Sequence, residues 1–556
     1  MRLLLFLFCL CPAPALTAAE SLEDLARDFF TWRTRQQPSS GDDIPRVERP
    51  ADWVPRFSAQ DLAAYQEAYT NYRARLDRID PHGLNRSGQV DWLLVRAAME
   101  RVNWELNVLK APARNPNFYV HQTLGALYEL VLIQGVFDDA RCEQIIRVME
   151  SMPATVAAAR ANLNDPLAPF ARIAVHNLDK VAEKLQTVAE SLTMISPRAP
   201  HEALRENARA AGKALSDYRD WLKAGLPKMS SDFVVGRDAY VYFLQNIALI
   251  PASPEELLRQ GRQAWYRAVA FETYAGVRNA GLPQQKIFPD AATQIRQQAL
   301  DEQAVRDFLE AKNIMTVPSW LKHYYNQVTP PHIAPLAHMG VVDDLTGPSR
   351  LDQDAVSYIP EPREGMSYFR AATAKDTRPI IVHEGVPGHY YQMARSWQNP
   401  NYIRRHYIDS GANEGIGFYV EEMLLQFGLF DDRPRTREII YNFMRLRALR
   451  VEVDIRLALG DMSIQAAGDY LAEAVPMDRP TAVEEAGFFA MVPGQAITYQ
   501  IGKTQILQFL AKARLQKGED FDLRAFHDYL MVNGNVPIAL LEWEYLNSKE
   551  KLPFLP

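Results

Sequence analysis

The chain has 556 residues with a formal net charge of −7, and 47% of them are hydrophobic and 23% charged, which is ordinary for a globular protein. This charge excludes the basic footprint of a nucleic-acid-binding protein, and no segment after the N-terminus is long and apolar enough to span a membrane. The length exceeds what one core usually organises, so we expect at least two subdomains.

Residues 1–19 have the features of a cleaved secretory signal peptide. One Arg precedes an apolar run at residues 3–10, and small residues end at Ala19. Cys9 and Cys11 lack the small residues expected before a lipidated cysteine, which disfavours a lipoprotein. We therefore expect export to the periplasm or the extracellular space, with Cys142 as the single cysteine of the mature chain and no internal disulfide.

Residues 20–315 predict a helical N-terminal subdomain. Ser253-Pro254-Glu255-Glu256 is a helix start signal, with a capping Ser, a Pro at the first helical position and a Glu that completes a capping box. Residues 143–150 and 178–192 have apolar residues at helical spacing. Pro153 is expected to separate the first of these from an alanine-rich helix that reaches Arg160.

Residues 316–556 predict a second subdomain, which we expect to carry the active site. Its first part contains short β-rich runs at residues 341–342, 356–359 and 366–369, bounded by Pro and Gly, and these predict a small sheet. Tyr358 and Tyr368 lie in these runs and fit equally well as core aromatic residues of that sheet.

Residues 378–392 contain the side chains that we expect to form the functional site. His383, Glu384 and His389 combine two imidazoles with a carboxylate next to an apolar run, a grouping typical of a divalent metal site with a base beside the bound water. We expect one Zn²⁺ per chain. An iron centre with two histidines and one carboxylate would use similar ligands.

The two histidines are six residues apart, whereas the common helical zinc signature sets them four apart. At about 100° per residue, six steps turn about 240°, so an unbroken helix would aim the rings at different faces. Pro387 is expected to break the helix, and Gly388 to tolerate the conformation that the break requires. The sequence thus predicts a distortion between the two ligands.

Apolar residues at positions 416, 420, 423, 424 and 427 predict an amphipathic helix that starts near Ser410 or Asn413 and supplies a third ligand. Glu414 and Glu421 are seven apart and share a face, so one can bind the metal while the other accepts a hydrogen bond from a ligand histidine. The spacing alone does not decide which does which. Glu422 is expected to face solvent.

The C-terminal part predicts a basic helix at residues 436–459, a polar linker near residues 478–484, and a helix after Pro493-Gly494. Gln495, Tyr499 and Lys503 are four residues apart and share one face of this last helix, which makes Gln495 and Lys503 candidate substrate contacts. A phenol here can donate to the oxyanion formed when water attacks a carbonyl. Helix packing for Tyr499 and solvation for Lys503 are the alternatives.

Three strings together resemble the bacterial family called domain of unknown function 885, which is grouped with the zincin-type metallopeptidases. They are His-Glu-x-x-Pro-Gly-His-x-x-Gln from residue 383, Glu-Gly-x-x-x-Tyr-x-Glu from residue 414, and Pro-Gly-Gln-Ala-x-x-Tyr-x-x-Gly from residue 493. The resemblance covers most of the mature chain. It implies a mainly α, zincin-like metallopeptidase fold with a large helical part and a small β-sheet beside the metal-binding helix.

The resemblance also implies roles for individual residues. The spacing from His389 to Glu414 and Glu421 is similar to that of thimet-type oligopeptidases, which implies that Glu414 is the ligand and Glu421 its support. Tyr499 is then the oxyanion donor. In zincins an edge strand holds an extended peptide, which places Tyr358 or Tyr368 near the substrate. His527, in a segment that resembles the closing helix of the family, is a further candidate contact.

These expectations combine into one function, a zinc peptidase that cleaves short peptides. Glu384 takes the proton from water as it attacks the scissile carbonyl and returns it to the leaving amine. Two other functions fit the same residues: a scaffold or binding protein that retains the metal site without turnover, and a metal-dependent hydrolase of another amide or an ester.

Overall fold

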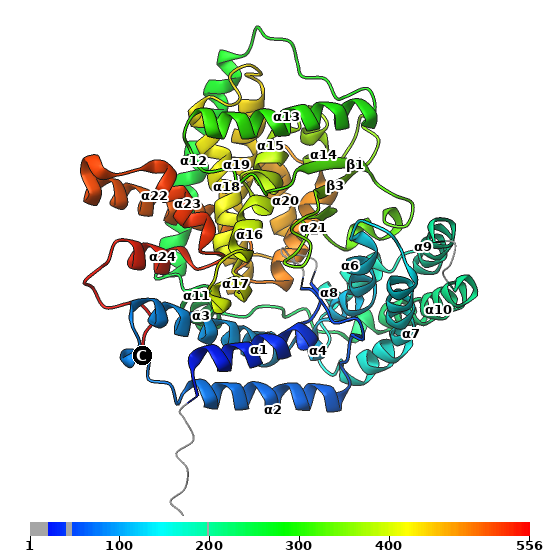
Figure 1. Cartoon of the computed structure of the whole chain (residues 1–556). Coiled ribbons are helices and arrows are strands. Elements are labelled where there is room, and N and C mark those ends of the chain that lie inside the picture. The colour runs from blue at the N-terminus through cyan, green and yellow to red at the C-terminus, as the bar shows by residue number, and fades with distance from the viewer. Residues whose placement is uncertain (1–19, 41–46, 197–199) are drawn as a thin grey trace, which may run out of the picture.

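A computed structural model describes residues 20–40, 47–196 and 200–556. The predicted signal peptide, residues 1–19, lies outside the described residues. Within them the protein is mainly α-helical, with one small sheet, as the helical spacing, the β-rich runs and the family resemblance predict. Figure 1 shows α1, α2 and α3 at the bottom of the molecule and α7, α9 and α10 at its right side, while α12 lies beside a central group that includes α16, α18 and α19 and α13 lies across the top.

The N-terminal half is built from helices joined by short 3₁₀ and π turns, which confirms its predicted helical character. The helices are α1 (Leu22–Gln36), α2 (Ala59–Leu76), α3 (Arg86–Asn103), α4 (Ala111–Arg114), α5 (Pro116–Val120), α6 (Ala126–Leu132), α7 (Asp139–Asn162), α8 (Ala168–Asn177), α9 (Val181–Ile195), α10 (His201–Gly225), α11 (Arg237–Asn246), α12 (Pro254–Arg278) and α13 (Ala291–Ala311). The predicted cap of α12 is present, because Ser253 accepts a hydrogen bond from the Glu256 N–H.

The prediction that Pro153 ends a helix is wrong. The α7 helix continues through Pro153 to Asn162, about two and a half turns further. A proline in a helix interior costs about 3 kcal/mol. The flanking Met149, Met152 and Val156 are buried, and at about 1.5–3 kcal/mol for each buried apolar side chain their packing outweighs that cost.

The sheet has three strands, β1 (Tyr324–Val328), β2 (Asp343–Asp344) and β3 (Ala355–Ile359), in the order β1-β3-β2. β1 is parallel to β3, and β2 is antiparallel to it. The run at residues 356–359 is therefore a strand as predicted, whereas β1 was not predicted. The run at residues 366–369 is not a strand, because Ser367 precedes helix α14 and Tyr368 begins it.

The C-terminal half holds helices that surround the predicted site. They are α14 (Tyr368–Thr373), α15 (Arg378–Ile380), the π turn η6 (Ile381–Gly385), α16 (His389–Trp397), α17 (Tyr402–His406), α18 (Ser410–Phe427), α19 (Thr436–Leu459), α20 (Ile464–Ala474), α21 (Arg479–Met491), α22 (Thr498–Lys517), α23 (Leu523–Val532) and α24 (Ile538–Tyr545). The predicted helix at 436–459 is confirmed. The predicted linker at 478–484 is wrong, because Asp478 caps α21 by accepting the Thr481 N–H at 3.0 Å.

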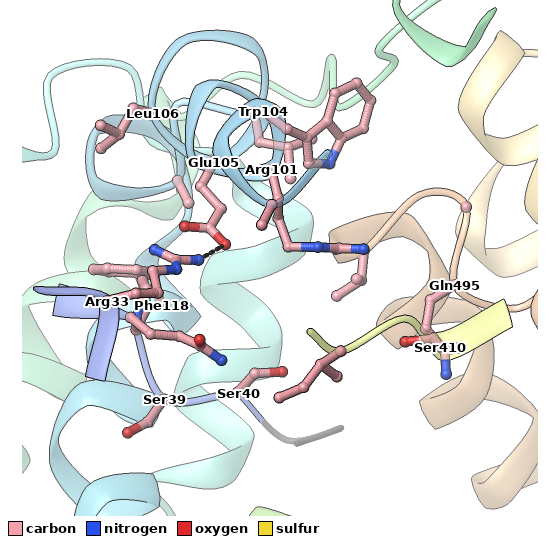
Figure 2. A pocket seen from close by; sticks show the side chains of 18 of the residues that line it. Arg33, Ser39, Ser40, Arg101, Trp104, Glu105, Leu106, Phe118, Ser410 and Gln495 are labelled. Atoms are coloured by element: carbon pink, nitrogen blue, oxygen red, sulfur yellow. Dashed lines mark hydrogen bonds and ion pairs between the residues drawn. The ribbon is translucent and has the colours of Figure 1, made fainter. Parts of the chain in front are cut away.

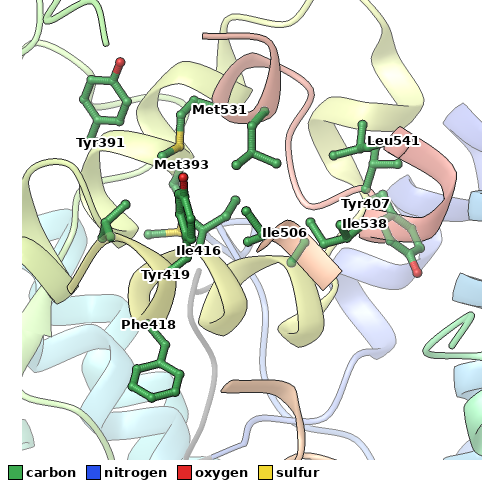
Figure 3. Packing of buried hydrophobic residues seen from close by; sticks show 14 of the residues in the cluster. Tyr391, Met393, Tyr407, Ile416, Phe418, Tyr419, Ile506, Met531, Ile538 and Leu541 are labelled. Atoms are coloured by element: carbon green, nitrogen blue, oxygen red, sulfur yellow. The ribbon is translucent and has the colours of Figure 1, made fainter. Parts of the chain in front are cut away.

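The largest apolar core joins residues from both halves of the chain. It contains Leu25 and Phe29 of α1 together with Tyr390 of α16 and Ile416 of α18. Figure 3 shows the part of this core in which Met393, Ile416, Ile506 and Met531 come together from four helices. The division at residue 315 stays a prediction, and the core packing crosses it.

A buried ion-pair network also links distant segments. Arg404 of α17 contacts Asp91 of α3 and Glu544 of α24, each at 2.9 Å. Helix α3 is thereby linked through α17 to α24, near the end of the chain. Among the helices of the described residues, none is long and apolar enough to cross a bilayer.

Candidate metal centre

His383 and His389 converge because the chain is broken between them. His383 and Glu384 lie in the π turn η6, and His389 is the first residue of α16. At the break Val386 is extended and the Val386–Pro387 peptide bond is cis. At Gly388 a Cβ atom would lie 1.8 Å from the His383 carbonyl oxygen, so only glycine fits. The two imidazole centroids are 4.8 Å apart.

Helix α18 brings two carboxylates to the imidazoles. Oε2 of Glu414 lies 3.5 Å from Nε2 of His383 and 3.3 Å from Nε2 of His389. Oε1 of Glu421, two turns further along the helix, lies 2.6 Å from Nδ1 of His383. Glu414 and Glu421 therefore lie next to different nitrogens of the His383 ring. This is consistent with their positions on one face of α18.

Gly417 lets α18 approach this closely. A Cβ atom at position 417 would lie 3.0 Å from Cε1 of His383 and 3.0 Å from Cε1 of His389. The rings therefore occupy the space that a side chain on this turn of the helix would fill. Only the hydrogen atom of glycine leaves room for both.

A third carboxylate faces the histidine pair. His383, Glu384 and His389 each offer a ligand atom, and these atoms lie within 4.8 Å of one another. Oε2 of Glu384 is 4.0 Å from Nε2 of His389. The group is buried, since His383 is 4%, Glu384 9%, His389 1% and Glu414 4% exposed.

The residues fit a divalent metal because their buried polar atoms are otherwise unused. Nε2 of His389, Oε2 of Glu384 and Oε2 of Glu414 are buried and make no hydrogen bond within the described residues. Buried polar atoms are normally hydrogen-bonded, so such a convergent set needs an explanation. Ligands held at about 2.0–2.1 Å by a tetrahedral zinc lie about 3.3–3.4 Å from one another. The 3.3 and 3.5 Å separations match that geometry.

The electrostatic environment separates the two carboxyl groups that face the histidines. Burial raises the pKa of Glu384 to about 8, although the His389 charge opposes the rise. For Glu414 burial also acts to raise the pKa, but the two imidazoles hold it well below its usual range. One carboxyl group is thus suited to bind a cation and the other to take up a proton.

The centre opens into a cavity of about 540 Å³. Its walls come from the sheet, from α19 and α21, and from N-terminal helices. Tyr358, Gln495 and Tyr499 line it, and their contact with a substrate stays a prediction. The Tyr499 ring is stacked on that of His383 with centroids 6.3 Å apart.

A family comparison decides to which group of proteins the chain belongs. Residues 39–544 match the family described as bacterial protein of unknown function, DUF885. The chain belongs to the DUF885 family. This match confirms the resemblance that the three sequence strings indicate. No curated protein matches the sequence.

Solved structures show where else this fold occurs. The chain resembles "a putative lipoprotein of unknown function" from Shewanella oneidensis at 17% identity and a TM-score of 0.71, covering 95% of this chain and 100% of that one. It also resembles "the putative lipoprotein from Colwellia psychrerythraea" at 15% identity and a TM-score of 0.72, covering 95% and 99% of the two chains. At these identities the likeness concerns the fold alone.

Three predicted substrate contacts of this DUF885 protein lie away from the cavity. Tyr368 donates a hydrogen bond to Asn442 and packs against neighbouring rings. His527 is fully buried between the Ile314 carbonyl and the Tyr419 hydroxyl, each at 2.8 Å. Burial lowers the His527 pKa to about 4, so the ring is neutral. Tyr368 and His527 therefore make their hydrogen bonds to other residues of the protein.

Lys503 is the third of these, and its position also corrects the expectation for Glu422. The Lys503 ammonium donates to Glu422 Oε2 at 2.8 Å and lies 3.9 Å from the centroid of the Phe418 ring. The side chains of Lys503 and Glu422 are only 6% and 12% exposed. Glu422 is therefore not solvated, because a buried cation on the adjacent helix needs an anionic partner.

Sequence reasoning missed the arginines of the site. Arg447 of α19 lies 3.2 Å from Glu421, and its guanidinium is 5.5 Å from the centroid of the Tyr499 ring. Arg450, one turn further, lies 4.7 Å from the same centroid and donates to Glu485 at 3.0 Å. The available signal was a pair of arginines three residues apart, which share one face of the predicted helix at residues 436–459.

Proposed function

We propose that this DUF885 protein is a zinc-dependent peptidase that cleaves short peptides. The observation that carries the proposal is the Glu414 oxygen that lies within 3.5 Å of Nε2 of both His383 and His389. Two neutral imidazoles and one carboxylate are a typical donor set of catalytic zinc. We assign these three residues as the ligands of one Zn²⁺ per chain.

Glu384 is assigned as the general base. Its carboxyl oxygen is 4.0 Å from Nε2 of His389, farther than the Glu414 oxygen, so it lies beside the ligand set and is not part of it. When bound, the cation supplies a Lewis acid that lowers the pKa of water and polarises the scissile carbonyl. Glu384 accepts the proton as water attacks, and then delivers it to the leaving amine.

Glu421 and Tyr499 both support this chemistry from positions next to His383. The Glu421 carboxylate next to Nδ1 of His383 fixes the ring tautomer so that Nε2 is free for the metal. Tyr499 lines the cavity beside His383, and we assign its hydroxyl as the hydrogen-bond donor to the oxyanion. An amine leaving group needs the proton that Glu384 returns, which favours peptides over esters.

The zincin-like fold and the location of the protein are part of the same proposal. Strand β3 of the small sheet lines the cavity next to the segments that carry the proposed ligands. This position supports a zincin-like arrangement, in which Tyr358 lies next to the bound peptide. A cavity of about 540 Å³ is within the usual range for small-molecule sites and suits short peptides. The sequence features of residues 1–19, together with relatives described as lipoproteins, support a location in the cell envelope.

The test combines metal analysis with hydrolysis of a peptide library. We expect wild-type protein to contain one equivalent of zinc, His383→Ala to contain none, and Glu384→Gln to retain zinc while its kcat falls by about 10²–10⁴. The exposed His82 provides a matched control, since His82→Ala should leave zinc and kcat unchanged.

The outcomes also separate the alternative functions. Bound zinc without peptide hydrolysis would contradict the peptidase assignment and point to a scaffold, or to a hydrolase of another amide or an ester. Iron in place of zinc would contradict the metal assignment. Loss of zinc in Glu384→Gln would show that Glu384 is a ligand and not the base.

A further inference from the structure

A second cavity, of about 280 Å³ (Figure 2), shares lining residues with the metal cavity. It is enclosed by α3, by the start of α18 and by the turn that precedes α22. Most of its lining is apolar and includes Phe29, Phe57, Leu106, Phe118, Phe243 and Val492. A dry cavity of about 150 Å³ is enough to bind benzene, so this space accommodates a large apolar side chain.

The second cavity adjoins the candidate metal centre. His121, Phe488, Met491 and Gln495 line both cavities. Ser410 lines the second cavity and lies four residues before Glu414 on α18, which corresponds to about 6 Å along the helix. Two residues of an extended peptide span about 7 Å, so a substrate held at the metal ligands reaches this space.

Arg101 places a positive charge in this apolar space. It lies in the last turn of α3, is partly buried, and makes no hydrogen bond or ion pair with the described residues. Figure 2 shows its side chain extending across the pocket toward Gln495 and Ser410. A guanidinium has five N–H donors and is suited to hold a carboxylate by two of them.

The acidic groups around Arg101 are engaged elsewhere. Glu105 pairs with Arg33 at 2.5 Å and accepts from the Tyr65 hydroxyl. Asp409 caps α18 by accepting the Ala412 N–H at 3.0 Å. Burial raises the Asp409 pKa to about 6, with the Arg101 charge opposing the rise. Within residues 20–40, 47–196 and 200–556, no acidic side chain therefore forms an ion pair with Arg101, and its donors can face a ligand.

His121 offers a further polar atom at the junction of the two cavities. Its Nδ1 is buried and makes no hydrogen bond within the described part of the chain. Burial lowers the pKa of this histidine to about 4, so the ring is neutral. A neutral imidazole here can hydrogen-bond to a peptide group that passes from one cavity to the other.

We propose that the second cavity binds the carboxyl-terminal end of the substrate, with an apolar terminal side chain among the aromatic residues and the free carboxylate on Arg101. This inference rests on the proposed peptidase function and adds the direction in which the peptide lies. The preferred substrate is a short peptide with an apolar C-terminal residue.

The test measures peptide binding in a Glu384→Gln background, so that turnover does not remove the ligand. The probes are acetyl-Ala-Ala-Leu with a free carboxylate and the same peptide as its C-terminal amide, titrated calorimetrically into the zinc-loaded full chain. We expect the free carboxylate to bind at least about tenfold more tightly. Arg101→Gln should abolish the difference, and Arg101→Lys, which keeps the charge but not the two-pronged geometry, should retain part of it.

Arg370 provides the matched control. It lines the metal cavity and, like Arg101, makes no ion pair with the described residues. Arg370→Gln should preserve the preference for the carboxylate. Equal affinity for the two peptides, a preference that survives Arg101→Gln, or a preference lost in Arg370→Gln would each overturn the proposal. Hydrolysis by the wild type is scored separately, so an inactive protein with an Arg101-dependent preference contradicts the peptidase function and supports this site.

Discussion

Gly417 is the residue whose size the candidate centre depends on most directly. An added methyl group would lie 3.0 Å from a ring carbon of each histidine, so one ring would have to move. We predict that Gly417→Ala lowers zinc affinity by at least about tenfold while the protein remains folded, because alanine is favoured over glycine in a helix by about 1 kcal/mol. Competition with a zinc chelator measures the affinity.

The control for this variant is Gly276→Ala. Gly276 also lies in a helix, and no atom lies within 4 Å of the position that its Cβ would occupy. It should leave zinc affinity unchanged. Unaltered affinity in Gly417→Ala would contradict the assignment of both histidines as ligands.

Glu421 contacts Nδ1 of His383, the ring nitrogen that does not face Glu414. The carboxylate lies 2.6 Å from Nδ1 and 3.2 Å from Arg447. Glu421→Gln keeps the shape but removes the negative charge, which weakens the donor strength of the ring and leaves Arg447 uncompensated. We predict a 10- to 100-fold loss of zinc affinity, the usual cost of removing such a support. An unchanged zinc affinity in Glu421→Gln would show that Glu421 only pairs with Arg447 and does not support His383 as a ligand.

Among elements, the contact between α18 and α22 determines where Tyr499 lies relative to Glu414. The two helices cross at Gly411, Gly415 and Gly502, and a Cβ at position 502 would lie 2.2 Å from the Gly411 carbonyl oxygen. We predict that Gly502→Ala separates the helices and destabilises the fold by about 1–3 kcal/mol, the usual cost of overpacking. Denaturant unfolding tests this.

The same variant should affect the proposed reaction selectively. His383, His389 and Glu414 do not lie on α22, so zinc content should persist while kcat falls, because Tyr499 moves away from the substrate. An unchanged kcat in the folded variant would remove Tyr499 from the mechanism.

Elements with a local signal were predictable, whereas those fixed by distant contacts were not. The cap at Ser253 and the periodicity of α19 identify their helices within the sequence. The strand β1 has no such signal, because Tyr324 and its neighbours are held by pairing with β3 about 30 residues later. At Asp478 a capping residue was read as part of a linker, since polar residues at a helix start resemble a loop.

At the scale of the whole molecule, the grouping of His383, Glu384 and His389 was predictable and its surroundings were not. Two histidines and a glutamate are specified by their own side chains, and the break at Pro387 and Gly388 by local sterics. The positions of Arg101, Arg447 and Arg450 depend on how helices far apart in the sequence pack. The sequence alone does not show which residues these arginines contact.

The last prediction concerns how metal binding affects the whole chain. A ligand that binds only the folded state stabilises it by RT ln(1 + [L]/Kd), which is about 4 kcal/mol at 1,000 times Kd. We predict that zinc removal lowers the midpoint of thermal unfolding by several degrees, and that Glu384→Gln behaves like the wild type whereas His383→Ala shows no response to zinc. The largest core contains residues of α1 as well as α16 and α18, so the shift should affect a single transition. Two transitions, of which only one responds to zinc, would instead show that residues 20–315 and 316–556 unfold as separate subdomains.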